Sequence, residues 1–281
     1  MLTTRRKIAL ARIAQRAVMF GRRAFRKGPQ TNAYRRGIAW NLDLREGIDF
    51  AIWLLGAFEP ATVGAYARLV RSGDVVFDVG ANIGAHTLHL ARAVGRAGRV
   101  HAFEPTEWAR AKLVANLELN PGLRDRVTVV PAMLMAQSAA AAPPLYSSWP
   151  LAGAGDAHQL HGGRKMAARG AHVTTLDDYV ADAKIDRLDF VKLDVDGHER
   201  SVLHGGRNAF ARLRPVVVLE LSPHQLAEEG DSVDGLAALL AAMGYRLATL
   251  TGGALPSDGA TLRTLIKSGA SLNALARPAT G

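Results

Sequence analysis

The segment from Val75 to Pro105 constrains the fold of this chain more than any other part of it. It begins with a short apolar run, continues through a glycine-containing turn and a helix-spaced apolar stretch, and ends with a second apolar run. Asp78 lies near the end of the first run, and Glu104 directly follows the second. Apolar runs separated by a helix are typical of buried parallel strands. We therefore expect an α/β fold whose ligand site lies in the crevice at the carboxyl ends of these strands.

The glycine turn between the two predicted strands indicates which nucleotide this crevice accepts. Gly80 and Gly84 are separated by Ala81, Asn82 and one further residue. A dinucleotide site has the different spacing G-x-G-x-x-G, which lets the backbone approach a pyrophosphate. Asp78 would also meet that pyrophosphate as a like charge, which is unfavourable at short range. The turn therefore argues against NAD.

S-adenosylmethionine carries the charges that these residues would accommodate. It has no phosphate, and its sulfonium and ammonium groups would be attracted by Asp78. Its carboxylate suits the amino end of the helix that follows the turn. Glu104 lies about 20 residues beyond the turn, where an acidic residue binds ribose hydroxyls. The residues predicted to bind this cofactor are Asp78, Gly80, Ala81, Asn82, Gly84 and Glu104.

Seven short motifs resemble those of the FkbM-type methyltransferases and occur in the family's order. They are GAFE at 56–59, DVGANIG at 78–84, FEP at 103–105, TLDD at 175–178, KLDVDGHE at 192–199, VLHGG at 202–206 and VVVLE at 216–220. The segment after Val130 matches the family poorly, and Asp196 stands where the family more often has Glu. The resemblance implies a Rossmann-like class I methyltransferase fold. Its sheet would have seven mostly parallel strands, with helices on both faces.

The resemblance also implies an activity. Members of the family move a methyl group from S-adenosylmethionine, usually to oxygen. The expected acceptor is a hydroxyl group of a glycan, a glycolipid precursor or a secondary metabolite. Glu59, the last residue of the first motif, joins the residues expected to bind the cofactor.

Three residues at the end of the fourth predicted strand are the candidates for catalysis. Methyl transfer to a hydroxyl requires alignment of donor and acceptor and removal of the hydroxyl proton. His198 is predicted to take the proton, because its ordinary pKa of about 6.5 suits a base near neutrality. Asp194 would orient the substrate or the sulfonium, and Glu199 would hold the histidine or the ammonium, with helix capping as the structural alternative. His86 is an alternative base. No metal ligand is assigned, although Mg²⁺ held by Asp194 and another acid stays open.

The positive charge of the chain is concentrated at its amino end. The 281 residues carry a formal net charge of +10, yet the first acidic residue is Asp43. Eleven of the 35 lysines and arginines lie in residues 1–42, so the remainder has 24 basic and 25 acidic residues, a net charge of −1. Nucleic acid is therefore disfavoured as the partner of the catalytic domain. The absence of cysteine excludes disulfides and thiolate nucleophiles, and is compatible with the cytoplasmic location that we expect.

The basic amino-terminal segment predicts an amphipathic helix. Ile13, Ala17, Phe20 and Ala24 form one stripe of a helical wheel, and arginines lie elsewhere. Such a helix can rest on an anionic membrane, so residues 1–36 are predicted to make peripheral membrane contact. A targeting segment and a solvated helix packed on the domain are the alternatives. The longest apolar stretch is nine residues, far short of the ~20 that span a bilayer.

Composition and breaker residues divide the chain into three predicted parts. Residues 1–40 are the basic extension, residues 41–260 the methyltransferase domain, and residues 261–281 a C-terminal strand and tail. Residues 136–171 are rich in Ala, Pro, Gly and Ser, and are interpreted as a long loop or lid over the site, or as a disordered insertion. The antiparallel seventh strand is predicted at Thr261 to Ile266.

Two other classes of function fit some of these features. One is a nucleic-acid methyltransferase that docks through the basic extension, which would show a steep salt dependence. The other is a catalytically inactive protein that keeps the donor pocket as a scaffold. D-V-D-G stands at 194–197, where amino-methylating enzymes of nucleic acids have an N-P-P-Y type tetrapeptide, which argues against methylation of a base nitrogen.

Overall fold

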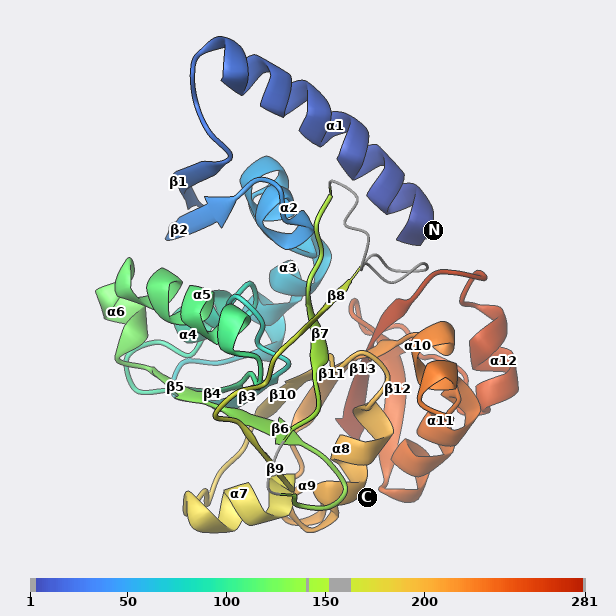
Figure 1. Ribbon diagram of the computed structural model, residues 1–281. Helices are drawn as coiled ribbons and strands as arrows, with labels where there is room; N and C mark the ends of the chain where they lie inside the picture. The colour runs from blue at the N-terminus through green and yellow to red at the C-terminus, as the bar shows by residue number, and fades with distance from the viewer. Residues whose placement is uncertain (1–3, 140–141, 152–162, 280–281) are drawn as a thin grey trace.

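A seven-stranded sheet forms the centre of the molecule (Figure 1). The computed structural model describes residues 4–139, 142–151 and 163–279. In spatial order the strands are β12 (Tyr245–Thr249), β13 (Leu272–Pro278), β11 (Val216–Leu221), β10 (Phe190–Leu193), β3 (Val75–Val79), β4 (Arg99–Phe103) and β5 (Val127–Val130). β11, β10, β3, β4 and β5 are parallel, and β13 runs antiparallel to its neighbours β11 and β12. The predicted Rossmann-like α/β fold is thus confirmed.

The order of the strands reverses beside β3. The chain passes from β3 to β4 and β5 on one side, and later returns to β10 and β11 on the other side. β3 therefore pairs with both β4 and β10. Such a switch point leaves a crevice at the carboxyl ends of the strands, because the connections on its two sides leave in opposite directions. The glycine turn that follows β3 lies at this crevice.

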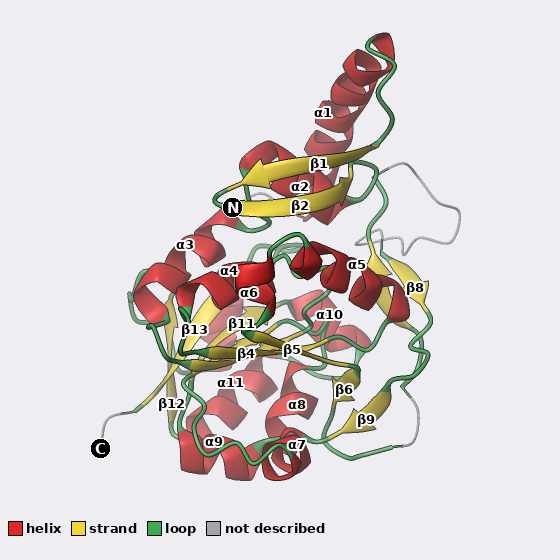
Figure 2. Ribbon diagram, turned by 90° about the vertical axis from the view of Figure 1, so that its left-hand side faces the viewer, coloured by secondary structure: helices red, strands yellow, loops and turns green. Residues whose placement is uncertain are grey.

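Helices cover both faces of the sheet (Figure 2), as the alternation of side chains along each strand requires. Phe77 and Leu193 pack with α7, α8, α9 and α11 on one face, and Val76 and Phe190 pack with α3 and α4 on the other. The helices of the domain are α2 (Gly47–Leu55), α3 (Pro60–Leu69), α4 (Thr87–Ala93), α5 (Glu107–Glu118), α6 (Pro121–Arg124), α7 (Leu176–Asp182), α8 (Glu199–Gly205), α9 (Arg207–Leu213), α10 (Pro223–Glu228), α11 (Val233–Ala242) and α12 (Gly259–Thr264). Across the described ranges, no single helix has the length and apolar character needed to cross a membrane, whereas α2 and α3 meet that test only jointly, across a 70° bend.

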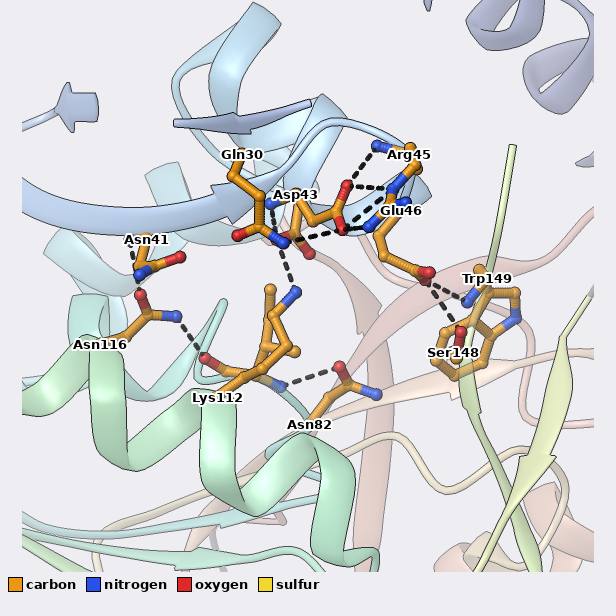
Figure 3. Close-up of polar contacts among 12 residues, drawn as sticks. Gln30, Asn41, Asp43, Arg45, Glu46, Asn82, Lys112, Asn116, Ser148 and Trp149 are labelled. Carbon is orange, nitrogen blue, oxygen red and sulfur yellow. Dashed lines mark hydrogen bonds and ion pairs between the residues drawn. The ribbon is translucent and has the colours of Figure 1, made fainter. Parts of the chain in front are cut away.

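The amino-terminal part of the chain is bonded to the domain. It consists of α1 (Thr4–Ala24) and an antiparallel hairpin of β1 (Gln30–Arg35) and β2 (Ile38–Asp43). The Oδ1 of Asn116 in α5 accepts the N–H of Asn41 at 2.9 Å, and its Nδ2 donates to the carbonyl of Ile83 at 3.1 Å (Figure 3). The expected boundary at residue 40 falls inside β2, and the division into domains stays a prediction.

Described parts of the 136–171 segment are packed against the rest of the molecule. Within it, β7 (Leu145–Ser148) pairs with β8 (Arg164–Met166), and the strands that flank it, β6 (Ala132–Leu134) and β9 (His172–Thr174), pair with each other. The Oε2 of Glu46 accepts bonds from the Oγ of Ser148 and the N–H of Trp149, each at 3.0 Å (Figure 3). Residues 140–141 and 152–162 of the predicted lid lie outside the described residues, and its role as a lid stays a prediction.

The predicted position of the antiparallel strand is wrong. Thr261 to Ile266 was expected to form it, but residues 259–264 form helix α12. Asp258 begins this helix, because its carboxylate accepts the N–H of Thr261 at 2.7 Å. The antiparallel strand is β13, which inserts between β11 and β12.

Replacing Asn116 with alanine should lower the free energy of unfolding by about 1–3 kcal/mol, because the N–H of Asn41 and the carbonyl of Ile83 would lose their partner. Denaturant unfolding of the full chain measures this change. Asn32→Ala, on the exposed side of β1, is the matched control and should change stability by less than about 0.5 kcal/mol. Equal effects of the two substitutions would contradict the coupling of the hairpin to α5.

Candidate active site

A cavity of about 800 Å³ opens at the carboxyl ends of β3, β4, β10 and β11. Its wall is formed by the glycine turn, by the residues that follow these strands, and by parts of α10 and β7. Residues of α1 and α2 complete the wall. Cavities of roughly 300–1,000 Å³ are typical of small-molecule sites. The cavity therefore lies at the switch point of the sheet, where the sequence predicted a ligand.

The turn after β3 brings the ends of two strands into close contact. Gly80 has a φ of +82°, and a Cβ at this position would overlap the carbonyl oxygen of Asp194 at the end of β10. Asn82 has a φ of +48°, its Oδ1 accepts the N–H of Ile83 at 2.8 Å, and its Nδ2 donates to the carbonyl of Ser147 at 3.1 Å. The 136–171 segment thus supports the turn directly, through β7.

The predicted cofactor residues of the turn divide into two groups. Gly80, Ala81 and Asn82 line the cavity. Gly84 has a different role, because a Cβ there would overlap the side chains of Leu88 and Leu113. Its lack of a side chain allows α4 and α5 to pack closely behind the turn.

Glu104 is buried in the wall of the cavity beside the glycine turn. Its Oε2 accepts the N–H of Asn82 at 2.9 Å, and its Oε1 accepts the N–H of Thr106 at 2.8 Å and the hydroxyl of the same residue. Burial raises the pKa of Glu104, and these hydrogen bonds oppose the shift. A carboxylate has about four acceptor positions, so one remains for a ligand hydroxyl.

Lys192 joins the acidic residues of β3 and β10 beneath the cavity. Its buried Nζ lies 3.1 Å from Asp194 Oδ2 and 3.8 Å from Asp78 Oδ1, and donates to the carbonyl of Gly80 at 3.2 Å. Burial works to lower the pKa of Lys192, but the two carboxylates outweigh it and hold that pKa above its ordinary value. Lys192 was not among the predicted site residues, although a lysine within the apolar run F-V-K-L was the available signal.

The prediction that Asp78 itself attracts the charges of the donor is corrected by its position. Asp78 is fully buried, and its Oδ2 accepts the hydroxyl of Thr87 at 2.6 Å. Burial raises the pKa of this carboxyl, and Lys192 and Thr87 oppose the shift. Asp78 therefore acts behind the wall, as a counter-charge that holds Lys192 in place.

Carboxylates gather on the wall of the cavity above Lys192. Glu59, Asp194, Asp196 and Glu220 all line it. Burial, and then the charge of Asp194, raises the pKa of Glu59, of Asp196 and of Glu220. Glu59 and Asp196 have left-handed φ values of +45° and +52°, a strained conformation for residues other than glycine. The fold thus holds several acidic groups together at some cost, as functional sites often do.

Glu59 and Asp196 are held in place by neutral amide groups. Asn273 Nδ2 donates to Glu59 Oε2 at 2.7 Å, and Gln225 Nε2 donates to Asp196 Oδ1 at 2.5 Å. These amides fix the positions of the carboxylates without neutralising their charge. Lys192 offsets part of the charge of this acidic group, and a cationic ligand would offset more of it.

His198 and Glu199, predicted to act together, lie on different sides of the cavity wall. His198 lines the cavity, and its Nδ1 is 3.5 Å from Glu229 Oε2. Burial lowers the pKa of His198, against the effect of Glu229. Glu199 is buried, and its Oε1 accepts the N–H of Val195 at 3.1 Å and that of Gly197 at 3.4 Å. The predicted catalytic role of Glu199 is therefore corrected to support of the loop between β10 and α8.

His86, the alternative base, also lines the cavity but is enclosed by aromatic residues. Its Nδ1 lies 2.8 Å from the hydroxyl of Tyr66, and its Nε2 lies 3.7 Å from Glu59 Oε2. Burial pushes the pKa of His86 well below its ordinary value. Within the part of the chain that the structure describes, no group of three or more His, Asp or Glu side chains is arranged to hold a metal ion.

A known protein family matches the part of the chain that contains the glycine turn and the strands around it. The family model described as the methyltransferase FkbM domain matches residues 78–247. The match begins at Asp78 in β3 and ends in β12. It therefore contains the glycine turn, Glu104, Lys192 and His198.

Individual relatives match over about half of the chain. The chain is 30% identical over 148 residues to the hexuronic acid methyltransferase AglP of Haloferax volcanii, covering 52% of this chain and 55% of the relative. It is 35% identical over 175 residues to the 31-O-demethyl-FK506 methyltransferase FkbM of Streptomyces tacrolimicus, covering 53% and 65%. The chain thus spans less than two thirds of either relative. The solved methyltransferase FkbM of Methylobacillus flagellatus is similar with a TM-score of 0.46 and 18% identity, over 75% of this chain and 47% of that one.

The buried position of Glu199 makes stability depend on pH. Burial raises its pKa to about 7, above the ordinary value of 4.5, so ionisation is harder in the folded than in the unfolded chain. This contribution to the free energy of unfolding should fall as pH rises from about 4.5 through 7 and then level off. Glu199→Gln keeps an acceptor oxygen and removes the titration.

The Glu199→Gln variant should therefore gain stability relative to the wild type between pH 5 and pH 8, by about 1.4 kcal/mol per unit of pKa shift. Denaturant unfolding at several pH values measures the difference, and the exposed Glu107→Gln is the control. A difference that is constant across this range would contradict the buried placement of Glu199.

Proposed function

The chain belongs to the FkbM methyltransferase family, and we propose that it transfers a methyl group from S-adenosylmethionine to a hydroxyl group of a glycan, a glycolipid precursor or a secondary metabolite. The observation that carries the proposal is the composition of one cavity. The glycine turn and buried Glu104 lie in the same wall as an acidic group made by Glu59, Asp194, Asp196 and Glu220.

This cavity suits S-adenosylmethionine better than a dinucleotide. Three of its carboxyls have raised pKa values because burial and neighbouring acids disfavour their ionised forms. A sulfonium and an ammonium would relieve that repulsion, whereas a pyrophosphate would increase it. Glu104 retains an acceptor position for a ribose hydroxyl, beside the backbone of Asn82.

S-adenosylmethionine supplies a methyl group already activated by positively charged sulfur. The acceptor oxygen forms a bond to the methyl carbon while the carbon–sulfur bond breaks and its electron pair stays on sulfur. His198 takes the proton of the hydroxyl, since its lowered pKa leaves the ring neutral near pH 7. Its Nδ1 faces Glu229, so Nε2 is the nitrogen that we assign as the base. Asp194 lines the same cavity and would orient the acceptor hydroxyl.

The relatives support oxygen as the accepting atom. One is named for a hexuronic acid, whose hydroxyls and carboxyl all offer oxygen atoms, and the other is named for a 31-O-demethyl compound, whose name specifies an oxygen. Carboxylates such as Asp194 and Asp196 accept hydrogen bonds from neutral hydroxyls and would repel phosphates. A hydroxyl of an uncharged acceptor therefore suits the part of the cavity lined by Asp194 and Asp196, and a nucleic acid does not.

A transfer assay tests the proposal directly. The full chain is incubated with S-adenosylmethionine labelled in its methyl group and with separated lipid, polysaccharide, RNA and small-molecule fractions of cells. Label should enter the lipid, polysaccharide or small-molecule fraction in a base-stable linkage, as expected for a methyl ether. Label that enters RNA instead, or no transfer to any fraction, would contradict the proposal.

Glu104→Ala should weaken binding of S-adenosylhomocysteine by about 1–3 kcal/mol, through loss of a charged hydrogen bond to the ribose. Calorimetry measures this, with NAD as the competing ligand, and NAD should not bind the wild type. Glu118→Ala, at the end of α5, is the control and should leave the affinity unchanged. Comparable affinity for NAD would overturn the assignment of the donor.

His198→Ala should lower turnover by about 10²–10⁴-fold and leave donor affinity nearly unchanged, which is the usual effect of losing a positioned base. Burial lowers the pKa of His198, so the wild-type rate should decline only below about pH 6.5, where the ring becomes protonated. His172→Ala, on the exposed end of β9, is the control. If the His198→Ala variant keeps the wild-type rate and the same decline of rate at low pH, His198 is not the base, and His86 or water takes the proton instead.

A further inference from the structure

We propose that the outer face of α1 docks on an anionic membrane surface. The helix has two faces of different character. Ala11, Ala14 and Val18 pack towards the domain, and Gln15 is buried between them, where its Nε2 donates to the carbonyl of Leu44 at 3.3 Å. These contacts fix the rotation of the helix, and therefore determine which side chains face outward.

Large apolar side chains lie on the outward face of α1. Leu10, Ile13 and Phe20 are 56%, 66% and 79% exposed, and Phe25, just beyond the helix, is 78% exposed. Residues three, seven and ten positions apart lie on one side of an α-helix, so the first three form a continuous stripe. Figure 1 shows α1 as a rod at the edge of the molecule, beyond α2 and away from the sheet. The stripe is therefore directed away from the domain.

The charges beside the stripe indicate which occupant it accepts. Arg16 and Arg23 are exposed on the flank of the same face, and Arg26 and Lys27 follow the end of the helix. The chain has no acidic residue before Asp43, so α1 itself carries no carboxylate to offset these charges. An apolar stripe with cationic flanks is the pattern of a helix that lies in the interface of an anionic bilayer. A second copy of this chain would present the same positive charges and repel them.

The inner side of the same helix reaches the cavity. Lys7, Ile8, Ala11 and Arg12 form part of its wall. A membrane contacted by the outer face therefore lies one helix diameter, roughly 10 Å, from this part of the cavity wall. This step rests on the proposed function. The geometry indicates that the hydroxyl accepting the methyl group is carried on a lipid headgroup.

Vesicle co-sedimentation of the full chain tests the docking surface. The wild type should bind vesicles of phosphatidylcholine with 30% phosphatidylglycerol, and should not bind pure phosphatidylcholine. The double substitution Ile13→Ser with Phe20→Ser should weaken binding at least tenfold, and Arg16→Gln with Arg23→Gln should weaken it about fivefold per arginine. Leu265→Ser with Val114→Ser removes two exposed apolar residues elsewhere, and should leave binding unchanged.

Two further measurements make each outcome decisive. S-adenosylhomocysteine affinity and the unfolding midpoint should stay at wild-type values in the Ile13→Ser and Phe20→Ser variant, because neither residue lines the cavity. A wild type that fails to bind anionic vesicles, or a variant that binds them equally, would overturn the docking surface and leave the proposed reaction standing. Concentration-dependent dimers that the same variant abolishes would assign the stripe to a second copy instead.

Discussion

The ion pairs of Lys192 are the interaction on which the rest of the site depends. Parallel strands β3 and β10 each bring an acidic residue to the switch point of the sheet, and one lysine lies between them. Without a cation there, the buried carboxylate of Asp78 would be isolated in the interior, at a cost of several kcal/mol. The lysine also bonds the carbonyl of Gly80, so it connects charge compensation to the shape of the glycine turn. The same ion pairs of Lys192 therefore support both the pairing of β3 with β10 and the shape of the candidate site.

The walls of the cavity come from distant parts of the chain. Glu46, before α2, accepts bonds from Ser148 and Trp149, while Ser147 contacts both Thr106 and the side chain of Asn82. The amino-terminal segment thus contacts the 136–171 segment of the family domain, and Figure 3 shows Glu46 bonded to Ser148 and Trp149. Residues outside the matched span 78–247 contribute to it, including Glu59 and the inner face of α1. The cavity of this chain therefore depends on residues that the family domain alone does not supply.

The sequence predicted the features that depend on local pattern. Apolar strands, the glycine turn and the position of Glu104 all follow from neighbouring residues, and the fold class follows from their order. The partners of Lys192 could not be predicted, because Gly80 is 112 residues away and becomes adjacent only when β3 and β10 pair. The orientation of the Glu199 side chain could not be predicted either. This orientation depends on the left-handed conformations of Asp196 and Gly197. They turn the loop so that His198 faces the cavity and Glu199 faces the interior behind its wall.

The position of Trp149 has a practical consequence. It follows β7, lines the cavity and is held by Glu46 through its backbone N–H. The chain has four tryptophans, and of those described Trp40 is fully buried in the core. An indole in the wall of a binding site changes its emission when a ligand displaces water from its face. The protein therefore carries an intrinsic optical reporter of occupancy, which follows the arrival of a ligand without any attached label.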